Sequence, residues 1–221
     1  MIQELLKKSL KFTLFLFIFS CSVSEPVIKN DEWDITYNYN IETKSYYETL
    51  SLFLYIYDED GENDIERIFV IDDKNGLYWE LWEDNWDIRY IGDNKYLGAN
   101  NIQMNLDRPI PRVPLRIHVR DLAGEFTEGN VYITKKNVDV TTLKFPEIKK
   151  EGESLKLTNY NSGTLELIVN NEVIGKGVVT GEFQAFNQIF NIELSDLEDF
   201  ELWVKVIDGD LTLRSGPITS F

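Results

Sequence analysis

The chain has few of the side chains that most often form disulfides, metal sites and acid–base centres. Its 221 residues include one cysteine, Cys21, and one histidine, His118. A single cysteine forms no internal disulfide, and a single histidine excludes a multi-histidine metal site and makes a histidine-dependent triad a strained interpretation. No GxSxG, HExxH or P-loop motif occurs. We therefore expect no catalytic residues, no metal ligands and no cofactor. A carboxylate-pair hydrolase is the remaining enzymatic alternative, and nothing in the sequence selects a pair.

Positive charge is also scarce. There are 22 lysines and arginines against 38 acidic residues, and the formal net charge is −16. Residues 1–21 hold three lysines and one glutamate, so the remaining 200 residues carry −18. Nucleic-acid recognition needs basic residues that neutralise phosphates, and binding to anionic lipid headgroups needs a basic face. The negative charge therefore argues against a nucleic-acid partner. It is explained either by solubility or by binding to a cationic partner.

No apolar run is long enough to span a bilayer. The longest extends from Phe12 to Phe19 and follows Lys7, Lys8 and Lys11. A bilayer requires roughly 20 apolar residues, whereas a charged segment followed by a short apolar one is typical of a secretory signal. We therefore predict a signal peptide over residues 1–20.

The segment Ile18-Phe19-Ser20-Cys21 resembles a bacterial lipobox, with an apolar residue at −3, a small residue at −1 and the cysteine after it. Phe19 at −2 departs from the enteric pattern and is similar to the looser lipoboxes of spirochaete lipoproteins. The resemblance implies cleavage before Cys21, a diacylglycerol on its thiol and acylation of the new amino terminus. Residues 21–31 would then be a lipidated tether to the bacterial cell envelope, at the outer membrane rather than the inner. An ordinary cleaved signal and an uncleaved anchor are the alternatives.

The rest of the chain predicts an all-β protein. Short runs rich in Val, Ile, Tyr, Phe and Trp alternate with Asp, Gly and Asn clusters, and no stretch keeps a 3.6-residue apolar period. Residues 194–202 allow no more than a turn of helix, and residues 92–105 are expected to be a long connection. The expected strands are 33–41, 49–57, 65–71, 77–82, 86–91, 113–120, 130–134, 154–158, 164–170, 173–179, 182–192, 200–207 and 210–214.

A lysine-containing stretch poor in strand signals, residues 134–152, predicts a boundary near residue 140. It divides the chain into a sandwich domain over 32–140 and a smaller one over 141–221. The ends of the two halves are weakly similar, since each has an alternating strand, an Asp and Gly turn and a return strand. The pattern resembles two tandem immunoglobulin-like or fibronectin III-like β-sandwiches.

The segment LYWELWEDNW, residues 77–86, combines three tryptophans with three acidic residues. Strand alternation places Leu77, Trp79 and Leu81 on one face, which predicts Trp79 as a core residue. The other face is predicted to point outward. Exposed aromatic rings beside carboxylates are typical of sugar-binding or protein-binding surfaces. The alternative is that the outer tryptophans pack beneath residues 92–105. The candidate ligand-binding aromatics are Tyr78, Trp82 and Trp86.

Four of the seven arginines lie within residues 108–120. Alternation places Val113, Leu115, Ile117 and Val119 inward and the residues between them outward. The outward side chains could bind a carboxylated or sulfated polymer or an acidic partner. The alternative is ion pairing with Asp and Glu on neighbouring strands. The candidates, beside Arg108, are Arg112, Arg116, His118 and Arg120.

The loop DEDGEND, residues 58–64, offers oxygen ligands in Asp58, Asp60, Asn63 and Asp64. It departs from the EF-hand pattern because its glycine is fourth rather than sixth and strands flank it. We expect a turn here, with a calcium site as the alternative.

These features predict a non-catalytic, surface-exposed lipoprotein, adhesin-like, with the membrane as one partner through its lipid and a protein or glycan as the other. A periplasm-facing structural or assembly component of the cell envelope is the alternative function. The fold does not choose between them.

Overall fold

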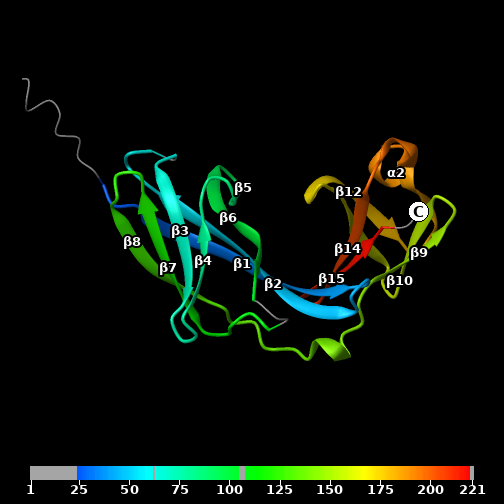
Figure 1. Ribbon diagram of the computed structural model, residues 1–221, viewed down its shortest axis with the longest axis horizontal. Coiled ribbons are helices and arrows are strands. Elements are labelled where there is room, and N and C mark those ends of the chain that lie inside the picture. Colours follow the sequence, from blue (N-terminus) through cyan, green and yellow to red (C-terminus); the bar gives the residue numbers. More distant parts are fainter. Residues whose placement is uncertain (1–23, 62, 105–107, 220–221) are drawn as a thin grey trace, which may run out of the picture.

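Strands dominate the computed structural model, which describes residues 24–61, 63–104 and 108–219 (Figure 1). The prediction of an all-β protein is confirmed. The expected signal peptide and Cys21 lie outside the described residues. None of the helices in these three ranges has the length and apolar character needed to cross a membrane.

Fifteen strands of the described residues form three sheets. The largest has eight strands in the order β12-β11-β14-β15-β1-β2-β6-β5, the second is β4-β3-β7-β8 and the third is β13-β10-β9. The strands before residue 140 are β1 (Val27–Asn40), β2 (Ser45–Tyr57), β3 (Ile65–Asp72), β4 (Leu77–Leu81), β5 (Asp87–Ile91), β6 (Asn94–Gln103), β7 (Pro114–Asp121) and β8 (Phe126–Tyr132). Those after it are β9 (Glu147–Glu151), β10 (Ser154–Thr158), β11 (Ser162–Val169), β12 (Glu172–Thr180), β13 (Gln184–Ala185), β14 (Phe200–Asp208) and β15 (Leu211–Ile218).

A long hairpin of β1 and β2 connects two lobes (Figure 1). The strands have 14 and 13 residues, so each extends over about 45 Å. In the first lobe β2 pairs with β6, and the sheet β4-β3-β7-β8 faces these strands. In the second lobe residues 36–40 of β1 pair in parallel with residues 212–216 of β15. The eight-stranded sheet therefore runs through both lobes.

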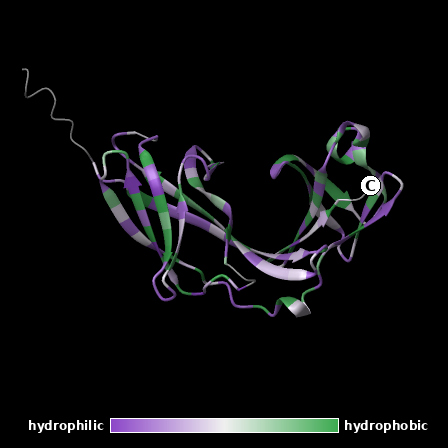
Figure 2. Ribbon diagram, in the orientation of Figure 1, coloured by the Kyte–Doolittle hydropathy of each residue, from purple (hydrophilic) through white to green (hydrophobic). Residues whose placement is uncertain are grey.

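Alternation along the strands builds the core (Figure 2). Strands such as β3 and β7 turn every second side chain inward over most of their length, and their apolar side chains are buried between the sheets. One continuous cluster of buried residues passes through both lobes. In the first lobe it includes Leu50, Leu52, Leu54, Leu115, Ile117 and Val119, and in the second Leu155, Leu165, Leu167, Phe186, Leu202 and Val204.

The boundary predicted near residue 140 falls in a 3-10 turn, η2 (Val140–Thr142). Strands from both sides of it, β1 and β2 before and β11, β14 and β15 after, lie in the same sheet. The division into 32–140 and 141–221 stays a prediction. The sequence gives no sign of the shared sheet because the β1–β15 pairing joins residues near opposite ends of the chain.

The prediction of a connection over residues 92–105 is wrong, because β6 occupies residues 94–103 between β2 and β5. Asn and Gly are unfavourable in strands, so the Asn- and Gly-rich sequence of β6 does not indicate a strand. Tyr96, Leu97 and Ala99 are nonetheless buried. Burial in the sheet outweighs the low intrinsic propensity. Likewise β9, in a stretch expected to be a linker, pairs with β10.

The strand predicted over 182–192 is also wrong. After the two residues of β13 the chain forms α2 (Phe186–Phe190) and ends it at Asn191, which has a φ of 55°. Phe186 and Phe190 lie one turn apart and both are buried, with ring centroids 4.9 Å apart. A Cβ at Gly177 of β12 would lie 2.4 Å from the carbonyl oxygen of Ile189, so the glycine allows α2 to approach. The single turn η3 (Leu194–Asp196) agrees with the expectation for 194–202.

Candidate binding pocket in the first lobe

A tight turn, residues 82–86, joins β4 to β5 and carries two of the candidate tryptophans. The backbone N–H groups of Asn85 and Trp86 donate to the carbonyl of Trp82, each at 2.9 Å. The Asn85 side chain accepts from the Trp82 N–H at 2.8 Å and donates to the Glu80 carbonyl at 3.1 Å. Asparagine favours turns because it bonds to nearby backbone in this way. The turn therefore holds both tryptophans in defined positions.

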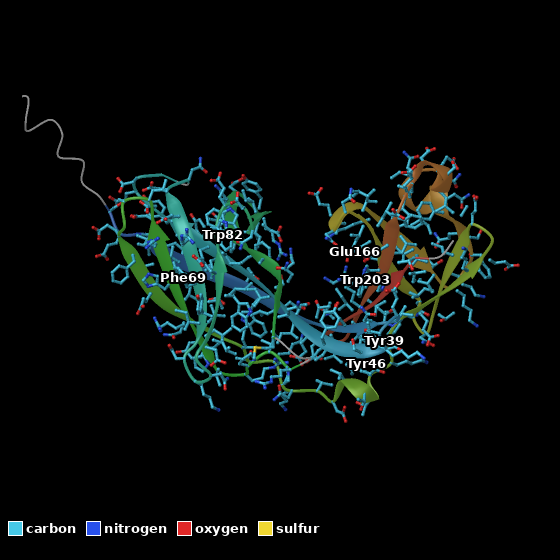
Figure 3. All side chains as sticks on the ribbon, viewed as in Figure 1. Tyr39, Tyr46, Phe69, Trp82, Glu166 and Trp203 are labelled. Atoms are coloured by element: carbon cyan, nitrogen blue, oxygen red, sulfur yellow. The ribbon has the colours of Figure 1, made fainter. Side chains whose placement is uncertain are left out.

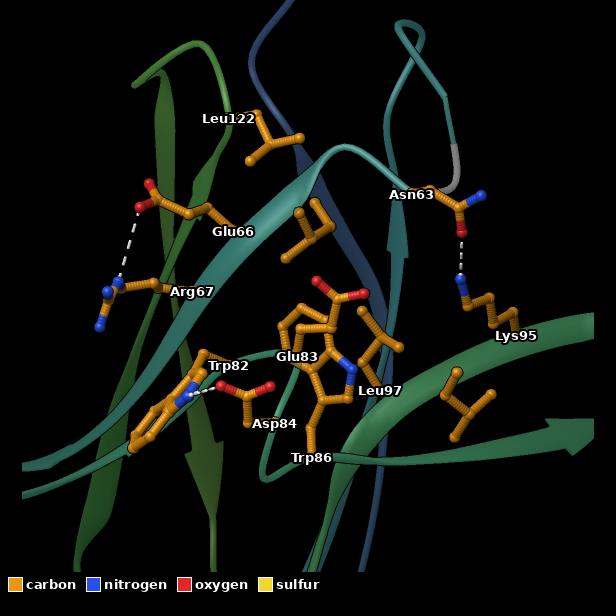
Figure 4. Close-up of a pocket in the computed structure, with 12 residues that line it drawn as sticks. Asn63, Glu66, Arg67, Trp82, Glu83, Asp84, Trp86, Lys95, Leu97 and Leu122 are labelled. Carbon is orange, nitrogen blue, oxygen red and sulfur yellow. Dashed lines mark hydrogen bonds and ion pairs between the residues drawn. The ribbon is translucent and has the colours of Figure 1, made fainter.

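A pocket opens where β4 ends (Figure 4). The five residues of β4 pair only with residues 68–72 of β3, so residues 65–67 of β3 extend beyond it. The pocket has a volume of about 660 Å³, within the range of small-molecule sites. Its apolar lining is Ile65, Trp82, Trp86, Ile88, Leu97 and Leu122, and its polar lining is Asn63, Glu66, Arg67, Glu83, Asp84 and Lys95.

The two tryptophans differ in their surroundings. Trp86 packs against the buried core, whereas Trp82 is half-buried with its indole N–H donating to Asp84 Oδ2 at 3.2 Å. The guanidinium of Arg67 lies 6.0 Å from the Trp82 ring, at the limit of a cation–π contact. Arg67 also bonds to Glu80 and lies 3.6 Å from Glu66. Charged groups thus fix the rim of the pocket around an aromatic face.

Apolar side chains at the pocket remain open to solvent. Ile88 is 52% exposed and Leu122 is 66% exposed, although both line the pocket. Ile88 lies on β5, an edge strand whose five residues are all exposed. Apolar side chains grouped at a concave surface are typical of a binding site rather than of ordinary surface.

Tyr78 and His118 lie elsewhere, on the outer face of the four-stranded sheet. Their rings belong to a row that crosses all four strands: Tyr78 on β4, Phe69 on β3, His118 on β7 and Phe126 on β8. Successive ring centroids are 6.3, 5.8 and 5.0 Å apart. Figure 3 labels Phe69 of this row and Trp82 of the pocket in the same lobe. The sequence placed Tyr78 with Trp82 on one strand face, but the end of β4 separates the two.

Arg116 and Arg120 lie beside this row, and the predicted inward and outward faces of β7 are confirmed. Arg116 donates to both oxygens of Asp73 at 2.9 Å and to Glu128 at 2.8 Å, and Arg120 donates to Glu66 at 2.9 Å. The bonds from Arg116 lower the pKa of the Asp73 carboxyl. The bond from His118, followed by Arg116, lowers the pKa of Glu128. These arginines therefore already have anionic partners.

Arg112 is separated from the other candidates. It lies in the connection before β7, largely buried, and faces Glu48 of β2. Its guanidinium lies 3.0 and 3.1 Å from the two Glu48 oxygens, and its Nε donates to the Lys135 carbonyl at 2.9 Å. Arg112 thus connects three segments in the interior.

Trp79, predicted as a core residue, is partly buried and packs against the core cluster. Its indole N–H donates to the Gln103 carbonyl at 2.9 Å, which joins β4 to the end of β6. Four further residues line the pocket although no pattern in the sequence points to them: Arg67, Ile88, Lys95 and Leu97. They come from three separate strands, and only the fold brings them to the tryptophan turn.

A second hollow lies on the concave side of the eight-stranded sheet, between the lobes, with a volume of about 440 Å³. Its cationic lining residues are Arg89, Lys176, Lys205 and Arg214, against the acidic Asp34 and Glu166. Glu166 pairs with Arg214 at 3.0 Å and with Lys176 at 3.5 Å. The pocket at Trp82 and Trp86 combines two exposed apolar side chains, Ile88 and Leu122, with two of the predicted binding residues. The chain matches no protein-family model, no curated protein and no solved structure.

Proposed function

We propose that the protein is a lipid-anchored, non-catalytic binding module of the bacterial cell envelope, exposed at the surface, that binds a protein or a glycan. The anchor rests on the lipobox resemblance at Cys21. The observation that carries the binding role is the pocket lined by Trp82, Trp86, Ile88 and Leu122. Aromatic faces contribute large contact area at low cost in side-chain entropy.

The rim favours a ligand with both apolar and polar groups. Carboxylates of Glu83 and Asp84 and the ammonium of Lys95 lie around the aromatic floor. A sugar ring has an apolar face that stacks on an indole and hydroxyls that bond to such groups. A protein loop with one aromatic or aliphatic anchor would use the same features.

The immunoglobulin-like relationship belongs to the same proposal. It is supported by the two sheets that face each other in each lobe. The arrangement differs from two separate immunoglobulin-like sandwiches in that one sheet runs through both lobes. Tandem β-sandwiches commonly present binding surfaces away from the membrane.

Trp82→Ala tests the pocket. We expect at least a tenfold loss of affinity for any ligand found on a glycan array or a panel of extracellular proteins, since buried aromatic anchors contribute about 2 kcal/mol or more. The melting temperature should change little, because Trp82, unlike Trp79, does not belong to the side chains that pack against the core cluster. Trp79→Ala should instead lower the free energy of unfolding by about 3 kcal/mol.

Tyr132→Ala is the matched control, since Tyr132 is an exposed aromatic on β8 and does not line the pocket. It should bind like the unmodified chain. Equal binding by Trp82→Ala and Tyr132→Ala, measured by surface plasmon resonance, would remove the pocket from the proposal.

The alternative, an assembly component inside the envelope, is favoured by the open edge of β5. Among the residues that the structure describes, this strand pairs only with β6, and its Ile88 and Tyr90 are both exposed. An unpaired edge accepts a strand from a partner through backbone hydrogen bonds. The variant Arg89→Pro, which would interrupt that edge, should weaken binding of such a partner and leave a glycan ligand bound.

A further inference from the structure

Two inward-facing rows of side chains in the first lobe end in aspartates. On β2 the row of Leu50, Leu52, Leu54 and Ile56 continues to Asp58, and on β7 the row of Leu115, Ile117 and Val119 ends at Asp121. Asp58 is 7% exposed and Asp121 is 0% exposed. Each aspartate thus occupies an inward-facing position at which strand alternation predicts an apolar core residue.

The loop between β2 and β3 brings two more carboxylates to this end of the lobe. Oxygens of Asp58, Asp60 and Asp64 lie within 4.8 Å of one another. The backbone N–H of Leu122, next to Asp121, donates to the Asp64 carbonyl at 2.8 Å. Asp121 is a fourth carboxylate at this end of the lobe, beside the other three.

The buried carboxylates are only half satisfied. Asp58 Oδ1 accepts from the Asp60 N–H and Asp121 Oδ1 accepts from the Glu125 N–H, while both Oδ2 atoms are buried without a hydrogen-bond partner. Among the described residues no lysine, arginine or histidine pairs with any of the four. A buried carboxylate without a partner is costly.

Asp72 provides an internal comparison, because it ends the inward row of β3 and is also 0% exposed. Its Oδ1 accepts from the N–H groups of Lys74 and Asn75, and its Oδ2 accepts from the Asn75 side chain. Burial of an aspartate in this lobe is thus compatible with full hydrogen bonding. The Oδ2 atoms of Asp58 and Asp121, which have no hydrogen-bond partner among the described residues, therefore differ from the Oδ2 atom of Asp72.

We propose that Asp58, Asp60 and Asp64 form a binding site for one Ca²⁺ ion. Calcium takes six to eight oxygen ligands in flexible geometry, which these carboxylates would supply together with water. Magnesium requires a closer octahedral arrangement and gives up its water reluctantly, so the site should prefer calcium. The three ligands belong to the DEDGEND loop, and the buried Asp121 lies beside that loop.

The site would fix the loop between β2 and β3, because Asp58 follows β2 and Asp64 precedes β3. Ser24 donates from its N–H to Asp60 Oδ2 at 2.8 Å and from its hydroxyl to Asp58 Oδ1 at 3.1 Å. Ion binding would therefore stabilise the segment through which the chain enters β1, three residues after Cys21.

Calorimetric titration of the purified full-length chain with CaCl₂, after EDTA treatment, tests the site. We expect one ion per chain with a Kd of about 10⁻⁴ to 10⁻³ M, as in extracellular calcium modules. At a calcium concentration tenfold above Kd the melting temperature should rise by about 3 to 6 °C, with a clearly smaller rise in MgCl₂. Asp58→Asn should abolish the calcium-dependent rise without lowering the melting temperature in EDTA, because the asparagine oxygen can still accept from the Asp60 N–H.

Asp210→Asn is the control, because Asp210 lies in the acidic turn between β14 and β15 of the other lobe and should keep the full calcium response. If Asp58→Asn does not fold, the variant Asp60→Asn, at an exposed position, should weaken calcium binding at least tenfold. The site would be overturned if millimolar calcium gave no heat of binding and no change in melting temperature. It would also be overturned if magnesium raised the melting temperature as much as calcium, or if the variants kept the full calcium response. None of these outcomes depends on the ligand of the tryptophan pocket.

Discussion

Arg112→Met is expected to lower the free energy of unfolding by about 3 to 5 kcal/mol, the usual cost of removing one partner from a buried ion pair. Glu48 is 4% exposed and would keep only its bond from the Ile110 N–H, at 2.8 Å. The lost Arg112 bond to the Lys135 carbonyl adds to the effect. Urea denaturation followed by tryptophan fluorescence measures the change.

Two further variants separate charge from packing. Arg116→Met removes an exposed arginine with two anionic partners and should cost about 1 kcal/mol or less. Glu48→Gln combined with Arg112→Met removes both charges and keeps an acceptor for Ile110, so it should cost less than Arg112→Met alone. An Arg112→Met loss no larger than that of Arg116→Met would contradict a structural role for the buried pair.

Gly98→Ala is expected to destabilise the first lobe by about 3 kcal/mol, which is large for a single added methyl group. A Cβ at this position would lie 1.9 Å from the carbonyl oxygen of Leu52 and 2.7 Å from the Cα of Phe53. Both are backbone atoms of β2, so the strands would have to separate. Thermal unfolding monitored by circular dichroism measures the loss.

Gly129→Ala is the matched control, because Gly129 also lies within a strand of the first lobe. Its added Cβ would meet only the end of the Ile28 side chain, at 3.1 Å. That side chain can move, so we expect a change below about 1 kcal/mol. Similar stability of both variants would mean that β6 does not lie as close to β2 as described.

Period-two alternation in the sequence predicted the local structure well. It identified β7 and its inward residues Leu115, Ile117 and Val119, because one face of that strand packs on the core and the other meets solvent. It also identified the segment with Trp82 and Trp86 as a binding candidate, although it placed Trp82 on a strand rather than in the turn after β4. These features depend on neighbours in the chain, which a sequence displays directly.

Contacts between distant segments could not be predicted. The partner of Arg112 is 64 residues away, and Asp121 joins a loop that precedes it by more than 50 residues. The strand β6 was missed because its Asn and Gly residues disfavour isolated strands, while its position between β2 and β5 stabilises it. The candidate residues were grouped by sequence, and the fold distributes them over a pocket, an outer face and a buried pair.

The central claim, a lipid-anchored module displayed on the cell, is tested most directly by protease shaving of intact and lysed cells, with Cys21→Ala as the control. The claim predicts that the protein incorporates labelled palmitate through Cys21, remains with the membrane fraction and is degraded on intact cells. Cys21→Ala should lose both the label and membrane retention. Labelling with survival until lysis would place the body inside the envelope and favour the assembly role. Membrane retention without palmitate, unchanged in Cys21→Ala, would contradict the anchor itself.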